Sequence, residues 1–259
     1  MKALWLAALL GLALPTQAGR NCDEKPLSVQ AASKAMQLAV QLRERLQQRN
    51  AEVAIIGRIG RDMSEYGLRY SHAGFVWRNH PKGPWLTRHL LNTCGTAQAE
   101  LYDEGLANFF MDSPLHYEVL ILQPKPELQG KLMQALRQPY RMFEPHYNLV
   151  AYPFSTRYQN SNQWVLETLA FAQAGESWNA PTRAAAQSWL QSQGYQPSTL
   201  SISALARLGG RLTQANVAFD DHPFGRRISR QIDVVTVESI ERFLTQHDWL
   251  ERREIVRIL

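Results

Sequence analysis

Apolar residues recur along this chain with two different periods, and the change of period marks the predicted elements. Over residues 28–50 they return every three or four positions, against a background of Arg, Gln and Glu. This spacing predicts an amphipathic helix, with Ser28 as its cap. Shorter apolar or alternating runs predict strands at 51–59, 70–78, 85–92 and 117–122. The Pro- and Gly-containing turn at 79–84 predicts that the second and third strands form a hairpin.

Most of the remaining predicted elements are helices. Residues 101–110 indicate a short helix or loop, and 128–136 a helix. A polar turn then leads into a helix beginning near Ser161 that is apolar on nearly every side and is therefore expected to be buried. Further predicted elements are helices at 182–193, 201–212 and 238–247, and strands at 231–237 and 254–259. Helices on either side of a cluster of strands predict an α+β fold.

The first residues have the pattern of a secretory signal peptide. Lys2 precedes an apolar run at 3–14, and Ala18 ends a segment of small residues suited to cleavage. We therefore expect residues 1–18 to be removed and the protein to be periplasmic or secreted. No later run approaches the roughly 20 apolar residues of a membrane-spanning helix, so no transmembrane segment is expected after cleavage.

The chain has two cysteines, Cys22 and Cys94. An oxidising compartment favours a disulfide between them, worth roughly 4 kcal/mol in the chain-entropy model. Neither cysteine has the spacing of a metal site, and no Gly-rich phosphate loop occurs, so we expect no metal and no cofactor. The net charge of +5 is spread along the chain, without the aromatic-interleaved basic stripe typical of nucleic-acid binding. Nucleic acid is therefore not an expected partner.

Candidate chemistry centres on two histidines and one serine. Strand alternation puts His72 and Gly74 on one face, and His89 falls on the next strand across the hairpin. The two imidazoles can therefore lie side by side, one orienting the other. Alone, each histidine also suits a hydrogen-bonded core position. Ser161 stands where a helix N-terminus can expose a nucleophile, although Asn160 and Ser161 are equally good capping residues.

These residues carry a resemblance to a known group. The strand S-H-A-G-F-V (71–76), a second polar residue one hairpin later, and N-S-N-Q-W (160–164) resemble, in that order, the circularly permuted papain-like group. That group includes the NlpC-type hydrolases and LRAT-like acyltransferases. The last motif resembles their Asn-Cys-Glu-His-Phe box, with Ser in place of Cys. The resemblance implies an antiparallel sheet packed on a buried helix, with Ser161 as nucleophile, His72 as base and His89 as orienter.

The resemblance also implies a domain organisation and an activity. The papain-like core would span residues 19–175, and 176–259 would form a helical C-terminal extension with one or two strands. The expected activity is acyl transfer or hydrolysis at an amide or ester of the cell envelope, either a peptidoglycan peptide or a lipid-linked acyl group. Besides the Ser161 N–H, the expected oxyanion donors and cleft residues are Gln159, Tyr158 and Asn160.

A catalytically inactive periplasmic binding or accessory protein is the alternative. The serine at position 161 suggests this alternative. A helix N-terminus and a neighbouring imidazole activate a serine hydroxyl less than they activate a cysteine thiol. The whole chain further resembles bacterial domain-of-unknown-function family 2145, which shares text like that of residues 147–164. That second resemblance implies no activity.

Overall fold

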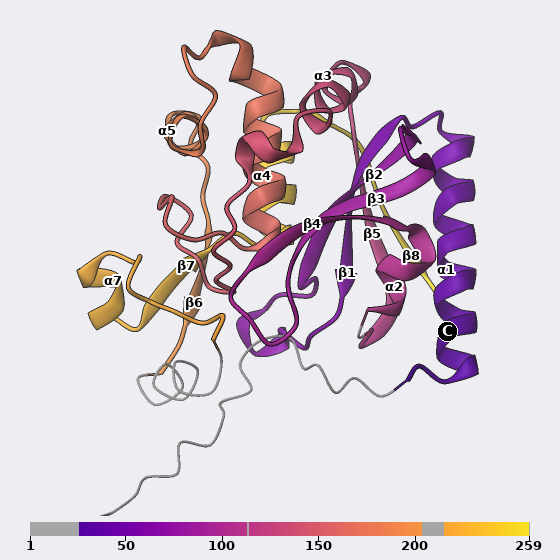
Figure 1. Cartoon of the computed structure of the whole chain (residues 1–259), viewed down its shortest axis with the longest axis horizontal. Helices are drawn as coiled ribbons and strands as arrows, with labels where there is room; N and C mark the ends of the chain where they lie inside the picture. The colour runs from indigo at the N-terminus through magenta and orange to yellow at the C-terminus, as the bar shows by residue number, and fades with distance from the viewer. Residues whose placement is uncertain (1–25, 113, 204–214, 259) are drawn as a thin grey trace, which may run out of the picture.

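The computed structural model describes residues 26–112, 114–203 and 215–258, and its centre is a six-stranded antiparallel sheet (Figure 1). The strand order is β4-β3-β2-β1-β5-β8. The strands are β1 (Val53–Ile59), β2 (His72–His80), β3 (Gly83–Asn92), β4 (Ala99–Gly105), β5 (His116–Pro124) and β8 (Leu250–Arg257). A separate pair consists of β6 (Ser198–Ser201) and β7 (Gln231–Val234). The predicted α+β class with an antiparallel sheet is confirmed.

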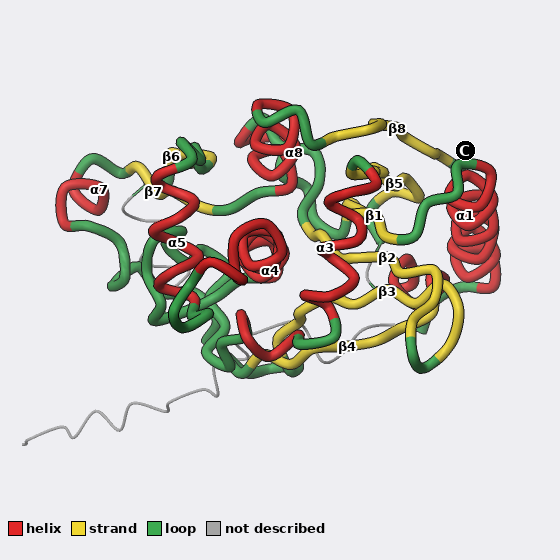
Figure 2. The backbone as a smooth tube through the Cα atoms, turned by 90° about the horizontal axis from the view of Figure 1, so that it is seen from above, coloured by secondary structure: helices red, strands yellow, loops and turns green. Residues whose placement is uncertain are grey.

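Helices cover both faces of the sheet and make a three-layered arrangement (Figures 1 and 2). One face is covered by α1 (Val29–Gln48) and α2 (Leu106–Met111). The other is covered by α3 (Pro126–Leu136), α4 (Ser161–Ala174) and α8 (Val237–Gln246). The remaining described helices are α5 (Arg183–Ser192), which contacts α4, and α7 (Phe224–Ile228), which contacts β7. Short 3-10 turns occur at Ser64–Tyr66, Pro139–Met142 and Gly175–Ser177.

Strand alternation assigns each side chain of β2 to one of the two layers. Phe75 lies on the α4 side, where its ring meets that of Trp164 edge-to-face at 5.6 Å. Val76 packs on the other side, with α1. Because apolar side chains are buried on both faces, the central strands read as nearly continuous apolar runs.

Three sequence predictions differ from the structure. Residues 101–110 were predicted to form a short helix or loop, but they form most of the edge strand β4 and then most of α2. The hairpin between β2 and β3 is tighter than expected, since the strands extend to His80 and Gly83 and His80 is buried. The predicted helix at 201–212 falls largely on residues outside the described part of the chain, and Ser201 closes β6 instead of beginning a helix.

The C-terminal segment contributes to the main sheet, because β8 pairs with β5 along its length. The boundary at residue 175 stays a prediction. The predicted signal peptide at 1–18 and Cys22 lie outside the described residues. Cys94 is not a free cysteine, and its pairing with Cys22 also stays a prediction. Among the described helices, none has the length and apolar character needed to cross a membrane.

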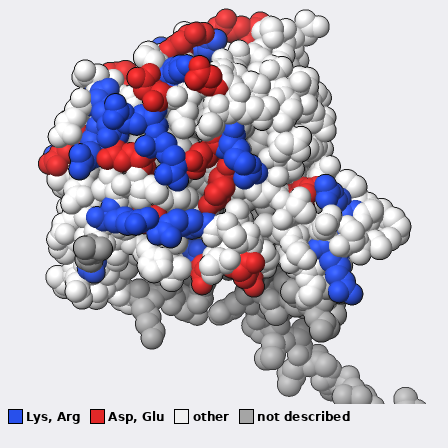
Figure 3. Space-filling view, turned by 180° about the vertical axis from the view of Figure 1, so that it is seen from behind, with Lys and Arg blue, Asp and Glu red and all other residues white. Residues whose placement is uncertain are grey.

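Charged side chains of both signs are interleaved on the face seen from behind (Figure 3). Ion pairs join Arg253 to Glu241 at 2.5 Å and Arg257 to Glu118. Charges along the edge strand β8 also disfavour pairing with a strand of another chain. The excess of positive charge therefore does not gather into a single basic patch on this face.

Candidate functional site

A cavity of about 730 Å³ lies where β2 and α4 both begin. Ser161 and His72 line it, together with Asn160, Tyr147 and Arg58. Apolar side chains form another part of its wall: Leu68, Leu149, Val150, Leu200, Ile202, Val234 and Val235. The fold thus brings two of the three predicted catalytic residues to one cavity, and the third, His89, contacts His72.

Helix α4 begins with a side-chain cap that leaves Ser161 in its first turn. The Asn160 side chain accepts a hydrogen bond from the Gln163 N–H at 2.8 Å, so the capping role belongs to Asn160. Ser161 is then the first helical residue, where backbone N–H groups have no partner within the helix. These N–H groups and the helix dipole favour negative charge beside Ser161.

The first turn of α4 is bonded to the start of β2. Asn162 Oδ1 accepts a hydrogen bond from the Ala73 N–H at 2.9 Å. Pairing of β2 with β1 extends to His72, whereas pairing of β2 with β3 stops at Phe75. The helix therefore meets the sheet where β2 and β3 separate. Because Ser161 precedes Asn162 and His72 precedes Ala73, this contact sets both candidates at one end of the sheet.

His72 and His89 form a buried imidazole pair. His72 Nε2 lies 2.8 Å from His89 Nδ1, and the rings meet edge-on with their centroids 5.1 Å apart. Phe109 of α2 packs against both rings, at 5.7 and 5.2 Å. The pair thus lies on the α1/α2 face, opposite the face on which the body of α4 packs. His72 and Ser161 both line the cavity at the end of the sheet.

Glu104 extends this pair into a relay of three residues. Its Oε2 lies 3.3 Å from His89 Nε2, within ion-pair distance but outside hydrogen-bond geometry. An ionised Glu104 favours a proton on His89 Nε2, which makes His89 Nδ1 an acceptor for the proton of His72 Nε2. In neutral His72 the remaining lone pair is then on Nδ1. Sequence reasoning missed Glu104 because β4 was not predicted; in that strand Glu104 pairs with Thr87, two residues before His89.

Tyr147 is a second residue that sequence reasoning missed. Its side chain is buried, and burial raises the pKa of its hydroxyl. Hydrogen bonds from the Ser161 hydroxyl and backbone N–H, and the charge of Arg61, act in the opposite direction on this pKa. Tyr147 therefore stays protonated at neutral pH, and it lines the same cavity as Ser161.

Two of the predicted oxyanion donors lie elsewhere. Gln159 is buried, and its amide donates to Met142 O at 2.7 Å and to Glu167 at 2.6 Å. Tyr158 is directed toward Asp220, 3.5 Å away. Neither residue belongs to the cavity wall, whereas Asn160 does. The expectation that Gln159 and Tyr158 donate to an oxyanion is therefore not supported by their positions.

A buried ion pair borders the cavity beside the imidazoles. Arg58 donates to the carboxylate and the backbone carbonyl of Asp112, and its guanidinium lies 5.2 Å from the Phe109 ring centroid. Asp112 is the C-cap residue that follows α2, so this contact fixes the end of the helix that covers both imidazoles. Within the described ranges, no group of three or more His, Cys, Asp or Glu side chains is arranged to hold a metal ion.

The close approach of β2 to His89 requires a glycine at position 74. A Cβ at this position would lie 3.0 Å from His89 Cβ and 3.1 Å from the Arg88 carbonyl oxygen. We expect Gly74→Ala to lower the free energy of unfolding by about 1–3 kcal/mol, because the added methyl group overpacks the site. Urea unfolding measures this change.

Gly130→Ala is the matched control. Its added methyl group meets no atom within 4 Å and lies inside α3. That substitution should stabilise the protein by about 0.5–1 kcal/mol, because alanine favours a helix. A Gly74→Ala protein as stable as the wild type would contradict the close approach of β2 to His89.

Comparison with known proteins gives one match. The family described as "Uncharacterized protein conserved in bacteria (DUF2145)" matches residues 45–244, which include every residue of the cavity wall named above. No curated protein and no solved structure matches the chain.

Proposed function

The chain belongs to the DUF2145 family of bacterial proteins, and we propose that it is an exported acyl-transfer enzyme with a permuted papain-like core. In this proposal Ser161 attacks an amide or ester carbonyl, His72 is the general base, and His89 orients His72. The observation that carries the proposal is the relay from Glu104 through His89 to His72, whose last member shares a cavity with Ser161.

Proton transfer follows from the tautomer that the relay favours. The Nε2–H of His72 donates the hydrogen bond to His89 Nδ1, so the basic lone pair of His72 is on its Nδ1. When Ser161 Oγ attacks the carbonyl carbon, its proton passes to this nitrogen. Protonated His72 then returns the proton to the leaving amine or alcohol, and water or an acceptor alcohol releases the acyl group by the same steps in reverse.

Stabilisation of the oxyanion is assigned to groups in the same cavity as Ser161. The proposed donors are the N–H of Ser161 in the first turn of α4 and the hydroxyl of Tyr147, which lines the same cavity. A neutral phenol donates to a developing negative charge, and the helix N-terminus favours the same charge. Tyr147 therefore replaces Gln159 and Tyr158 as the proposed side-chain donor.

The papain-like assignment is supported by the order of the parts along the chain. The base stands at the start of β2, its partner is on the neighbouring strand β3, and the nucleophile position opens the buried helix α4. The apolar part of the cavity wall suits the acyl portion of a lipid-linked substrate, and the polar end suits its carbonyl. Export rests on the signal-peptide pattern at 1–18.

A catalytically inactive binding protein is the second candidate. It is favoured by the position of the imidazole pair on the α1/α2 face, opposite the face on which the body of α4 packs. A serine at the place where papain-like enzymes hold a cysteine favours the same candidate. In this reading the cavity binds an acyl or peptide ligand without cleaving it.

Labelling with a serine-reactive acyl probe tests the first candidate. Wild-type protein should be labelled, and Ser161→Ala should abolish labelling. His72→Ala should slow it about 100-fold or more, the lower range expected for loss of a general base. Ser192→Ala and His146→Ala, at exposed positions, are the matched controls and should label as the wild type does. Labelling unchanged in both site variants would overturn the assignment, and an unlabelled wild type would favour the binding protein.

A further inference from the structure

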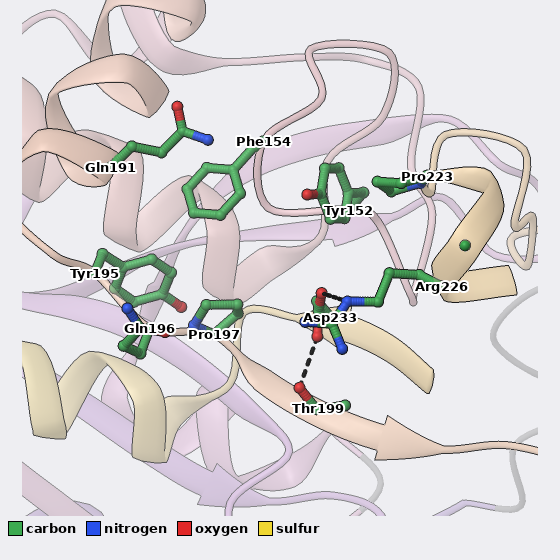
Figure 4. Close-up of a pocket in the computed structure, with 11 residues that line it drawn as sticks. Tyr152, Phe154, Gln191, Tyr195, Gln196, Pro197, Thr199, Pro223, Arg226 and Asp233 are labelled. Carbon is green, nitrogen blue, oxygen red and sulfur yellow. Dashed lines mark hydrogen bonds and ion pairs between the residues drawn. The ribbon is translucent and has the colours of Figure 1, made fainter. Parts of the chain in front are cut away.

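A second cavity, of about 640 Å³, is formed by the C-terminal half of the chain and the loop before α4 (Figure 4). None of the described residues in its wall lines the cavity of Ser161 and His72. Its size falls in the range of small-ligand sites, roughly 300–1,000 Å³. Loop residues 152–154, the end of α5, β6, β7 and the start of α7 contribute to it.

Aromatic rings form the middle of this cavity. Phe154 lies between Tyr152 and Tyr195, with ring centroids 5.8 and 6.3 Å away and both contacts edge-to-face. The Tyr195 hydroxyl is bonded to Ser239 at 2.7 Å, and the Tyr152 backbone N–H donates to Asp221 at 2.8 Å. Tyr195 is therefore buried and fixed, and the half-buried rings of Tyr152 and Phe154 present apolar area at little entropic cost.

Polar side chains lie on both sides of the rings (Figure 4). Gln191 and Gln196, which are exposed, stand on one side. On the other side Arg226 Nε is 2.9 Å from Asp233, which also accepts a hydrogen bond from Thr199 Oγ1 at 2.6 Å. Carboxamides both donate and accept hydrogen bonds, as the guanidinium and carboxylate do together. The guanidinium of Arg226 and the carboxylate of Asp233 are the only two charges among the described wall residues, and they cancel.

We infer that this cavity binds an uncharged saccharide. A sugar ring has C–H faces that pack on aromatic rings and a rim of hydroxyls, each of which donates and accepts. The rings and the two polar sides complement these features, and the balanced charge gives an ionic ligand no net attraction. An extended peptide is usually held by main-chain bonds along a strand edge, whereas the polar groups here are side chains on opposite sides of the rings.

Calorimetric titration of the full chain tests this inference with tetra-N-acetylchitotetraose and cellotetraose, both uncharged, as probes. Saturable binding of either saccharide is expected. Gln191→Ala/Gln196→Ala removes both carboxamides, and Phe154→Leu removes an aromatic face while keeping apolar volume. Each variant should raise Kd about tenfold, which is 1.4 kcal/mol. Gln47→Ala/Gln48→Ala, on the exposed side of α1, is the matched control and should leave Kd unchanged.

Three results would overturn the inference. The first is failure of both saccharides to saturate the wild type at millimolar concentration. The second is binding that is equally tight in the wild type and in both cavity variants. The third is saturable binding of an uncharged proline-containing tetrapeptide with neither saccharide bound. Because Ser161→Ala leaves this cavity intact, that variant should bind the saccharide as the wild type does, which separates this test from that of the acyl-transfer proposal.

Discussion

Ser161→Cys is expected to produce a thiol that ionises near pH 6.5 instead of near pH 8.5, the ordinary value for cysteine. The backbone N–H groups at the start of α4 and a protonated His72 both favour the thiolate. The apolar part of the cavity wall acts against this by disfavouring charge. We expect the first two effects to dominate, because Ser161 stands in the first turn of the helix, where both the N–H groups and the dipole act.

The measurement is the rate of alkylation by iodoacetamide as a function of pH. At pH 7 the thiolate fraction would rise from about 3% to about three-quarters for this change of pKa. A less basic thiolate is also a weaker nucleophile, with a Brønsted slope of about 0.4–0.5. The rate at pH 7 therefore rises only a few fold, and the midpoint of the pH profile is the decisive quantity. Ultraviolet absorbance of the thiolate gives the same midpoint without requiring entry of a reagent.

Controls separate the site from the chemistry of cysteine in general. Ser192→Cys, at an exposed position, should ionise near pH 8.5. Adding His72→Ala to Ser161→Cys should move the midpoint back toward that value. The wild-type protein, with its two native cysteines, gives the background. A midpoint at or above 8.5 for Ser161→Cys would mean that burial outweighs the helix and the imidazole, and that the pocket is not built for a nucleophile.

Much of the fold follows from local patterns. The i, i+3, i+4 spacing of α1 places Leu38, Leu42 and Leu46 inward, and all three are fully buried. Apolar runs identify β1, β2, β3 and β5 because these strands are buried. The edge strand β4 was missed for the opposite reason: its sequence A-E-L-Y-D-E-G is mostly polar and only partly buried. Pairing with β3, a tertiary contact, makes it a strand.

The parts of the candidate site that depend on the alternation of side chains along a strand were predictable from the sequence. The parts that depend on the register between strands, or on the path of a loop, were not. Period-2 alternation across a hairpin suffices to bring His72 near His89. The contact of Glu104 with His89 depends on the register of β3 with β4, which no local pattern reveals. Tyr147 shares a cavity with Ser161 because residues 145–160 fold back on themselves, as the bridge between Tyr147 and Gln159 shows. The sequence of that loop has no periodicity to indicate this.

Glu167 ties that loop to α4 through a buried network. It is fully buried and accepts hydrogen bonds from Arg183 Nε at 2.7 Å and from Gln187 at 2.7 Å. Arg183 also donates to the backbone carbonyls of Thr156 and Tyr158, at 2.7 and 2.9 Å. One guanidinium thus neutralises an interior carboxylate and holds the segment that leads into Ser161.

Arg183→Met is therefore expected to lower the free energy of unfolding by about 3–5 kcal/mol, because it leaves a buried carboxylate without its cation. The double variant Glu167→Leu/Arg183→Met should be more stable than Arg183→Met alone, since it removes the uncompensated charge. Arg253→Met breaks the exposed pair with Glu241 and should cost only about 0–1 kcal/mol. Urea unfolding of the four proteins measures these differences. If Arg183→Met cost no more than Arg253→Met, water would have to reach Glu167, and the network could not be what positions the loop before the candidate nucleophile.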